Sequence, residues 1–386
     1  MAPIFPAIAL AGPPHSGKST LTYWLSQKLR SVDVMHYVLR ASPDGEGDWS
    51  YETESDLVRV LRSRVRGEWT AEFANQVSHA VAHRHLPLLV DLGGKPSKEV
   101  LQIARQCTHA ILISADPARF EDWHRLFEQA DLQVIAQLHS VQQAEEYISD
   151  ATACLMGTIA DLKRELPPDG PMFRELLKRI GQIFSYTSQE LYDVHRQLAP
   201  SDYVLNVQAP LPPVHQRPGE RWEPAQLVPL LKSLPTDELL CVYGRGPVWL
   251  YGALAGLTPN LPFFQFDARY GWLASLEAVF AERPREPLRW SVAPYEQLHA
   301  HVKFDISGSL LDYTEAAPLH LPALPLESGV LLDGKLPNWL FTSLVRAYYQ
   351  HAWVAVYQVQ IGFVVVASRS TGMPIGSVLP APKSEI

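Results

Sequence analysis

The chain of 386 residues is poor in cysteine and in long apolar runs. Its three cysteines, Cys107, Cys154 and Cys241, lie far apart without a C-x-x-C pair, which argues against a disulfide framework or a zinc site. No apolar run approaches the roughly 20 residues that cross a bilayer, and the start MAPIFPAIALAGPP lacks an export signal. We therefore expect a cytoplasmic protein with no membrane partner.

Excess positive charge is also missing, because 33 basic residues face 41 acidic ones and the net charge is −8. This balance argues against a long duplex as partner, since nonspecific nucleic-acid binding relies on a basic surface. A small phosphorylated ligand held by a few local donors remains compatible. The length predicts two or three domains, and 47% hydrophobic residues are typical of globular proteins.

One phosphate-binding pattern is present near the start of the chain. An apolar run at residues 4–11 leads into G-x-x-x-x-G-K-[ST], matched by Gly12, Pro13, Pro14, His15, Ser16, Gly17, Lys18 and Ser19. Backbone N–H groups of such a loop, with the N-terminus of the next helix (about 19–29), surround an anion. We predict ATP as the ligand, with Lys18 on the β and γ phosphates and Thr20 as an uncharged neighbour.

A magnesium site is predicted beside this loop. Asp91 ends the apolar run 85–90, as a Walker B carboxylate would, so Ser19 and Asp91 are the expected Mg²⁺ ligands. Apolar runs alternate with helical patterns over residues 1–198, which predicts a doubly wound parallel sheet. Asp116 follows a further strand, and we favour a turn or N-cap role for it over catalysis.

An acidic glycine loop lies between the first helix and the Walker B strand. It carries Asp44, Glu46 and Asp48 and is followed by Trp49. Such a loop suits a metal, a water or a bound base, and it equally suits a solvated turn. The sequence leaves both interpretations open.

The second half of the chain contains an internal repeat. Residues 244–254 (GRGPVWLYGAL) match residues 334–344 (GKLPNWLFTSL) at an offset of 90, and a hairpin pattern follows each copy. Each copy predicts a strand, a basic Gly/Pro loop, a helix entered after proline and a two-stranded hairpin. Two small α/β modules are therefore expected at 199–287 and 288–386, after a P-loop domain at 1–198.

Both repeat loops predict an anion cradle, because each joins a cation to helix N-terminal donors. Tandem copies would set the cradles side by side, which suits a ligand with repeated phosphates. Trp249 and Trp339 could stack on a base, although tryptophans at this place in a helix more often belong to the core. The predicted ligand-binding residues are Gly244, Arg245, Gly246, Pro247, Trp249, Gly334, Lys335, Leu336, Pro337, Asn338 and Trp339.

The strings GRGPVWL, FDARYG and, in the second copy, GKLPNWL, AWVAVY and GFVVVAS resemble the third Csx family of CRISPR-associated ring nucleases. That family binds and cleaves cyclic tetra-adenylate, the second messenger of type III CRISPR defence. The chain is similar to the fused form, in which a P-loop ATPase (AAA-like) domain precedes the ring-nuclease part. The resemblance implies a metal-assisted phosphodiesterase, with Mn²⁺ as the metal such a nuclease site would use, in a homo-oligomer.

The resemblance assigns catalysis to Asp267 and Arg269, which match the family's x-D-x-R-x-G turn. The second copy has Gln358 and Gln360 there, and its His351 alone lies near the family's histidine zone. His299 and His301 are two apart on a predicted strand and so share a face. They suit proton transfer or a metal, although exposure on an edge strand is the favoured interpretation.

We expect a protein that binds ATP and cleaves cyclic oligoadenylate, with the P-loop domain as an ATP-dependent regulator. Two other functions fit the same residues. A sensor would bind both ligands without cleaving the ring, and the glutamines of the second copy favour it. A small-molecule kinase would use the P-loop with an acceptor near residues 44–49.

Overall fold

The computed structural model describes residues 5–41, 70–209, 220–296, 299–306, 311 and 313–381. The chain divides into two compact units, Met1–Val194 and His195–Ile386. The division falls within helix α7 (Ser188–Gln197), close to the expected boundary at 198. The two segments expected as separate modules belong to one unit. The acidic loop with Asp44, Glu46 and Asp48 lies outside the described residues.

The first unit is built on a seven-stranded sheet in the order β2-β3-β1-β4-β5-β7-β6. Its strands are β1 (Ala7–Ala11), β2 (Tyr37–Ala41), β3 (Leu88–Leu92), β4 (His109–Ser114), β5 (Gln133–Val141), β6 (Tyr147–Asp150) and β7 (Leu155–Ala160). All neighbours pair in parallel except β6 and β7. The predicted α/β class with a parallel sheet is confirmed.

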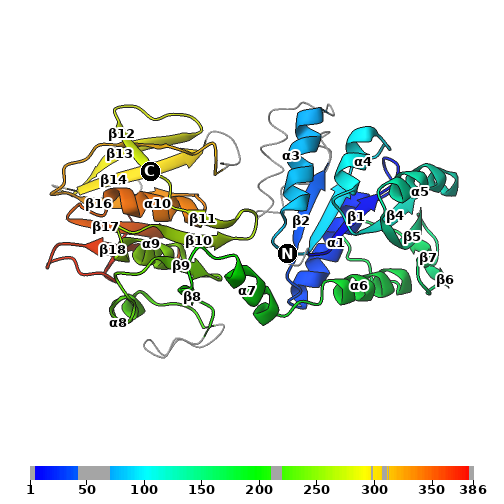
Figure 1. The fold of residues 1–386 in the computed structure, drawn as a ribbon, viewed down its shortest axis with the longest axis horizontal. Coiled ribbons are helices and arrows are strands. Elements are labelled where there is room, and N and C mark those ends of the chain that lie inside the picture. Colours follow the sequence, from blue (N-terminus) through cyan, green and yellow to red (C-terminus); the bar gives the residue numbers. More distant parts are fainter. Residues whose placement is uncertain are drawn as a thin grey trace. The chain divides into compact units, whose positions relative to one another are not determined.

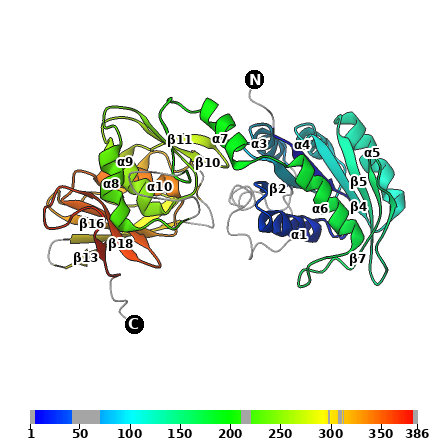
Figure 2. The same ribbon diagram turned by 90° about the horizontal axis from the view of Figure 1, so that it is seen from below.

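Helices cover both faces of this sheet (Figures 1 and 2). They are α1 (Lys18–Ser31), α3 (Ala71–Ala82), α4 (Lys98–Ala104), α5 (Phe120–Gln129) and α6 (Pro171–Ile183). Ala7, Ala9 and Ala11 join the core under α3, α4 and α5, whereas Ile8 and Leu10 join the core under α1 and α6. The alternation along β1 follows from the two-residue period of a strand. No helix among the described residues has both the length and the apolar character that crossing a membrane requires.

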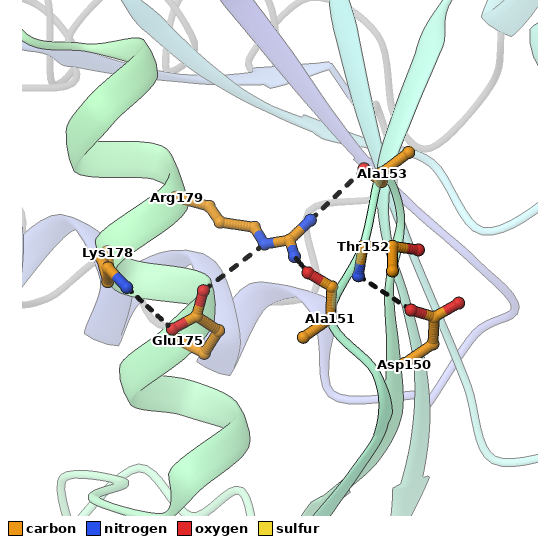
Figure 3. Close-up of polar contacts among 7 residues, drawn as sticks. All are labelled: Asp150, Ala151, Thr152, Ala153, Glu175, Lys178 and Arg179. Carbon is orange, nitrogen blue, oxygen red and sulfur yellow. Dashed lines mark hydrogen bonds and ion pairs between the residues drawn. The ribbon is translucent and has the colours of Figure 1, made fainter.

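Helix α6 is tied to the turn between β6 and β7 by Arg179 (Figure 3). Its guanidinium donates to the carbonyl oxygens of Ala151 and Ala153 and lies 3.7 Å from a carboxylate oxygen of Glu175. Within the turn, the Asp150 carboxylate accepts the N–H of Thr152 at 2.8 Å, which lowers the pKa of Asp150. The turn between β6 and β7 is therefore fixed to α6 by hydrogen bonds from the Arg179 side chain to backbone carbonyl oxygens.

The second unit contains sheets ordered β11-β10-β9-β8, β12-β15 and β13-β14-β16-β17-β18-β19. Its strands are β8 (Val204–Asn206), β9 (Leu240–Tyr243), β10 (Phe263–Asp267), β11 (Gly271–Ala274), β12 (Ala278–Ala281), β13 (Leu288–Tyr295), β14 (His299–Ile306), β15 (Leu319–Pro322), β16 (Gly329–Gly334), β17 (Trp353–Gln358), β18 (Gly362–Ser368) and β19 (Val378–Leu379). Its helices are α8 (Leu227–Ser233), α9 (Val248–Leu257) and α10 (Asn338–Tyr348).

The same succession of elements occurs twice in this unit. Strand β9 leads through α9 to the parallel strand β10, which forms a hairpin with β11. Strand β16 leads likewise through α10 to β17 and its hairpin partner β18. The two helices begin directly after Pro247 and Pro337, and residues 241–250 and 331–340 share one burial pattern.

The two successions share one hydrophobic core, which explains why they form one unit. A Cβ added to Gly252 of α9 would lie 3.1 Å from a methyl group of Val345 on α10. A Cβ at Gly256, one turn later, would lie 3.6 Å from Ala367 on β18. The absence of side chains at these two positions lets α9 pack closely against the helix and sheet of the other copy.

Arg346 of α10 reinforces this contact. Its guanidinium donates to the carbonyl oxygens of Ala255, Thr258, Pro259 and Leu261 at 2.7–3.1 Å. Ala255 lies in the last turn of α9, whose carbonyls lack partners within the helix, and the other three residues lie directly after it. Burial lowers the pKa of Arg346. The residue 90 positions earlier is Gly256, so only the second copy supplies such a clamp.

We predict that Arg346→Met lowers the free energy of opening of the α9 region by about 2–4 kcal/mol. Methionine keeps most of the packing but removes four hydrogen bonds to partly buried carbonyl oxygens. Hydrogen exchange of peptides covering residues 248–262 in the full chain measures the change. Arg283→Met, at an exposed arginine, is the matched control and should change exchange little. Equal exchange in both variants would contradict the role of the clamp.

Candidate functional site

The loop after β1 has a backbone that only particular residues allow. Gly12 has φ 148°, and a Cβ there would lie 1.8 Å from the carbonyl oxygen of Ile113. Gly17 has φ 86° and caps the N-terminus of α1. Non-glycine residues rarely adopt positive φ angles, although His15 in the same loop does so, with φ 60°. The two fixed glycines of the sequence pattern are therefore required by the shape of the loop.

Lys18 points back into this loop. Its ammonium group donates to the carbonyl oxygens of Gly12 at 2.8 Å and Pro13 at 2.7 Å. Ser16 also donates to Pro13, at 2.7 Å. The cation thus lies inside the loop, next to the first turn of α1, whose N–H groups have no helical acceptor. A phosphate group is the ligand that this combination favours.

Ser19 and Asp91 meet at the end of the sheet. The Ser19 hydroxyl donates to Oδ2 of Asp91 at 2.8 Å, and Asp91 is 4% exposed. They meet because β1 and β3 are adjacent parallel strands, with Leu10 opposite Asp91. One hydroxyl and one carboxylate fit the few protein ligands that Mg²⁺ takes beside phosphate oxygens and water. The site predicted for Mg²⁺ therefore has suitable donors.

Arg40, which the sequence analysis missed, lies beside Asp91. Its Nε is 3.8 Å from Oδ2 of Asp91, and the residue is 8% exposed at the end of β2. A buried charged side chain requires a partner of opposite charge. The arginine within the apolar run YVLRA was therefore the signal in the sequence for an acidic partner nearby.

Asp116 accepts the N–H of Ala118 at 3.1 Å and caps the short helix Pro117–Arg119, which confirms its turn role.

In the second unit the two repeat loops border one cavity of about 1190 Å³. Gly246, Pro247 and Val248 line it from the first loop, and residues 333–336 with Asn338 line it from the second. Strands β13, β14 and β17 complete the wall and contribute Arg289, Lys303 and Gln358. With Lys335, three cationic side chains reach the cavity, against the carboxylates of Asp305 and Asp333. The two repeat loops therefore share one space, although Gly244 and Arg245 of the first predicted cradle are not among the residues that line it.

The structure corrects the base-stacking role given to Trp249 and Trp339. Their exposed fractions are 0% and 1%, and both belong to the core that the two copies share. A ring without an exposed face cannot stack on a base. Both tryptophans therefore have the core role that their place in the helix favoured.

The Asp267–Arg269 pair is formed as expected. The Asp267 carboxylate accepts the backbone N–H of Arg269 at 2.8 Å and lies 3.3 Å from its Nε. Their side chains are 19% and 11% exposed, and neither lines the 1190 Å³ cavity. The pair lies at the end of β10, where Asp267 is opposite Gly271 in the hairpin.

One further residue, Tyr251, interacts with this pair. The hydroxyl of Tyr251 donates to the carbonyl of Gly244, and burial, followed by the charge of Asp267, raises the pKa of Tyr251. Tyr243 ends β9, and its hydroxyl lies 2.9 Å from Nδ1 of His195. His195 is fully buried and stacks on Phe266 at 4.1 Å. It lies outside the repeat, so no pattern in the sequence linked it to this end of the sheet.

The histidines of the second copy have separate roles. His351 is buried, and its ring nitrogens lie 3.1 and 3.3 Å from the carbonyl oxygens of Tyr348 and Leu324. His299 accepts the N–H of Gly329 at 2.9 Å, and His301 lies 3.3 Å from Asp333.

The favoured edge-strand interpretation of His299 and His301 is wrong, because β14 pairs with β13 on one side and β16 on the other. Among the described residues no three His, Cys, Asp or Glu side chains gather as metal ligands.

Two comparisons with known proteins bear on the chain. Residues 305–380 match the sequence profile of a family described as CRISPR-associated protein (Cas_csx3). The match covers the second loop, α10 and the β17–β18 hairpin, so the C-terminal region is similar to that family. A solved nucleotide-binding protein in complex with ADP, from Archaeoglobus fulgidus, is 13% identical and covers 48% of this chain and 90% of its own. Its TM-score of 0.25 is too low to carry an argument.

We predict that Lys18→Ala weakens binding of a nucleoside triphosphate at least about 100-fold and leaves the free energy of unfolding nearly unchanged. Lys18 contacts loop carbonyls rather than the core, and the variant removes a charge-assisted contact to phosphate. Calorimetric titration with ATP and Mg²⁺ measures the loss. Lys28→Ala, on the last turn of α1, is the control. Unchanged affinity in a folded Lys18→Ala protein would show that the P-loop does not bind the nucleotide.

Proposed function

We propose that the second unit binds cyclic oligoadenylate, with cyclic tetra-adenylate as the expected ring, and opens it by phosphodiester cleavage. The observation that carries the proposal is that both glycine-rich basic loops border one cavity. The similarity of residues 305–380 to CRISPR-associated (Cas_csx3) proteins supports the same function. Opening the ring would end the signal that type III CRISPR defence depends on.

The size and charge of the cavity suit a ring of nucleotides. Small-molecule sites occupy roughly 300–1000 Å³, and this cavity, at about 1190 Å³, is larger. Arg289, Lys303 and Lys335 supply cations for phosphates, and the helix N-termini after Pro247 and Pro337 supply backbone donors. A ligand with several phosphates uses both loops at once, which a mononucleotide cannot do.

Cleavage needs no external nucleophile. A ribose 2′-hydroxyl aligned with its own phosphorus can attack, so positioning and charge neutralisation supply much of the acceleration. Arg245, Lys335 and Arg269 would neutralise phosphates, and Asp267 would accept a proton or hold a metal. The Tyr251 hydroxyl bonds to the carbonyl of Gly244 in the first loop, and burial, followed by the charge of Asp267, raises the pKa of Tyr251.

The first unit would bind ATP with Mg²⁺ through the P-loop, Ser19 and Asp91. Ring opening by a 2′-hydroxyl consumes no ATP, so an ATP site on the same chain is most simply a control site. The chain would act as a homo-oligomer, in which neighbouring subunits would contribute side chains to each other's sites.

One specific observation favours a second candidate, a sensor that binds the ring without opening it. Asp267 and Arg269 do not line the shared cavity, and the second copy has Gln358 in the position of Asp267. A bound ring would then change conformation or assembly. Product analysis separates the two candidates, because a sensor returns the ring intact.

We predict that cyclic tetra-adenylate is converted to linear products by the wild-type chain, as resolved by chromatography. Asp267→Ala should reduce the rate by about 100-fold or more, as loss of a proton acceptor does, while ring affinity is retained. Gln358→Ala should change the rate little, because an amide at this position cannot accept the proton. Intact ring after long incubation with wild-type protein would refute cleavage, and equal damage from both variants would show that the copies contribute alike.

We also predict that ATP and the ring each tighten binding of the other by about 1–3 kcal/mol, since coupling between two binding sites is reciprocal. Titration of the ring at zero and saturating non-hydrolysable ATP analogue measures the coupling. Lys18→Ala should abolish it without changing ring affinity in the absence of nucleotide. Identical ring affinities in both conditions would show that the P-loop has no control role.

A further inference from the structure

A carboxylate and an imidazole are paired at the wall of the shared cavity. Asp333 is the second-last residue of β16, directly before Gly334 of the second loop, and lines the cavity. Its Oδ2 lies 3.3 Å from Nε2 of His301, and the two side chains are 23% and 15% exposed. Neither residue was given a role by the match to the x-D-x-R-x-G turn.

The fold places this pair by strand register. Strands β14 and β16 run parallel, with Lys303 opposite Asp333, and His301 precedes Lys303 by two residues on the same face. The edge of the His301 ring packs on Phe363 of β18 at 5.5 Å, which limits its rotation. The imidazole is therefore held from one side by an aromatic ring and directed to the carboxylate on the other.

The first copy repeats the arrangement with different chemistry. Tyr243 precedes Gly244 as Asp333 precedes Gly334, and the Tyr243 hydroxyl lies 2.9 Å from Nδ1 of His195. In both copies a histidine from another element bonds to the residue before the loop glycine. Only the second copy has a carboxylate there, and only Asp333 of these two residues lines the shared cavity.

A carboxylate beside phosphate-binding cations needs a partner in the ligand other than phosphate, because like charges repel. A ribose 2′-hydroxyl is a donor that lies next to every phosphate of a cyclic oligoadenylate, and it distinguishes RNA from DNA. The same hydroxyl is the nucleophile of ring opening. The charged and titratable groups around the pair are Arg289 on β13, Lys303 and Asp305 on β14, Lys335 after β16 and Tyr357 on β17.

We propose that Asp333 is a second catalytic base for ring opening and that His301 is its positioning residue. The inference rests on the proposed function. The proton of the 2′-hydroxyl passes to the Asp333 carboxylate as the 2′-oxygen bonds to phosphorus. The bond from phosphorus to the 5′-oxygen breaks with its electron pair, and that oxygen takes a proton from solvent water. The products carry a 2′,3′-cyclic phosphate and a 5′-hydroxyl.

His301 acts on this base through its position. Its Nε2 lies 3.3 Å from Oδ2 of Asp333, so the contact fixes the direction in which the carboxylate faces the cavity.

Single-turnover cleavage of cyclic tetra-adenylate by the full chain tests the inference in the Asp267→Ala background, where about 1% of the rate should remain, with ring affinity measured in parallel. Adding Asp333→Asn, which preserves shape, should lower this residual rate by about 100-fold or more while affinity changes less than about threefold. Adding His301→Ala should lower the residual rate about 10-fold, and His301→Gln, which keeps an N–H donor, should regain most of it.

His320→Ala is the matched control, because His320 lies on β15, away from both loops in the sequence and outside the cavity lining. It should cleave like the wild type. A residual rate that stays the same when Asp333→Asn or His301→Ala is added to Asp267→Ala would overturn the role of the pair while cleavage itself stands. A wild-type chain that neither binds nor opens the ring would overturn the proposed function and this inference together.

Discussion

The contact between α9 and α10 is the constraint on which the second unit depends. Gly252 and Gly256 remove the side chains that would separate the helix from the other copy, and Arg346 closes its C-terminal end with four hydrogen bonds. Each helix begins at the proline that ends a basic loop. Close packing of the helices therefore brings their N-termini, and both loops, to one cavity.

In the first unit the corresponding constraint is the backbone of the loop after β1. Its glycines adopt angles that other residues avoid, which turns the chain sharply enough for Lys18 to fold into the loop. Adjacency of β1 and β3 then brings Ser19 to Asp91. Four residues at fixed spacing, Gly12, Gly17, Lys18 and Ser19, produce the loop, so it can be recognised without knowing the rest of the fold.

That difference explains how much could be predicted from sequence. The loop, the carboxylate of Asp91, the parallel sheet and the proline-started helices follow from local patterns, and each was predicted. His195, Arg40 and the pairing of His301 with Asp333 depend on which strands become neighbours, and no local pattern encodes that. The tryptophans show the opposite error: their ring chemistry suggested a ligand, whereas their place on the buried side of each helix decided their role.

The most direct test of the account is whether one ring engages both loops. Equilibrium titration of cyclic tetra-adenylate should be made with the wild type, Val248→Glu, Lys335→Ala and the double variant, with Arg283→Ala as a control. Val248 lines the cavity from the first loop, and a carboxylate there would repel a phosphate. The account predicts that each loop variant weakens affinity by about 10-fold, or about 1.4 kcal/mol, and that the double variant loses more than either. Full affinity in either variant, with loss confined to the other, would contradict a shared site.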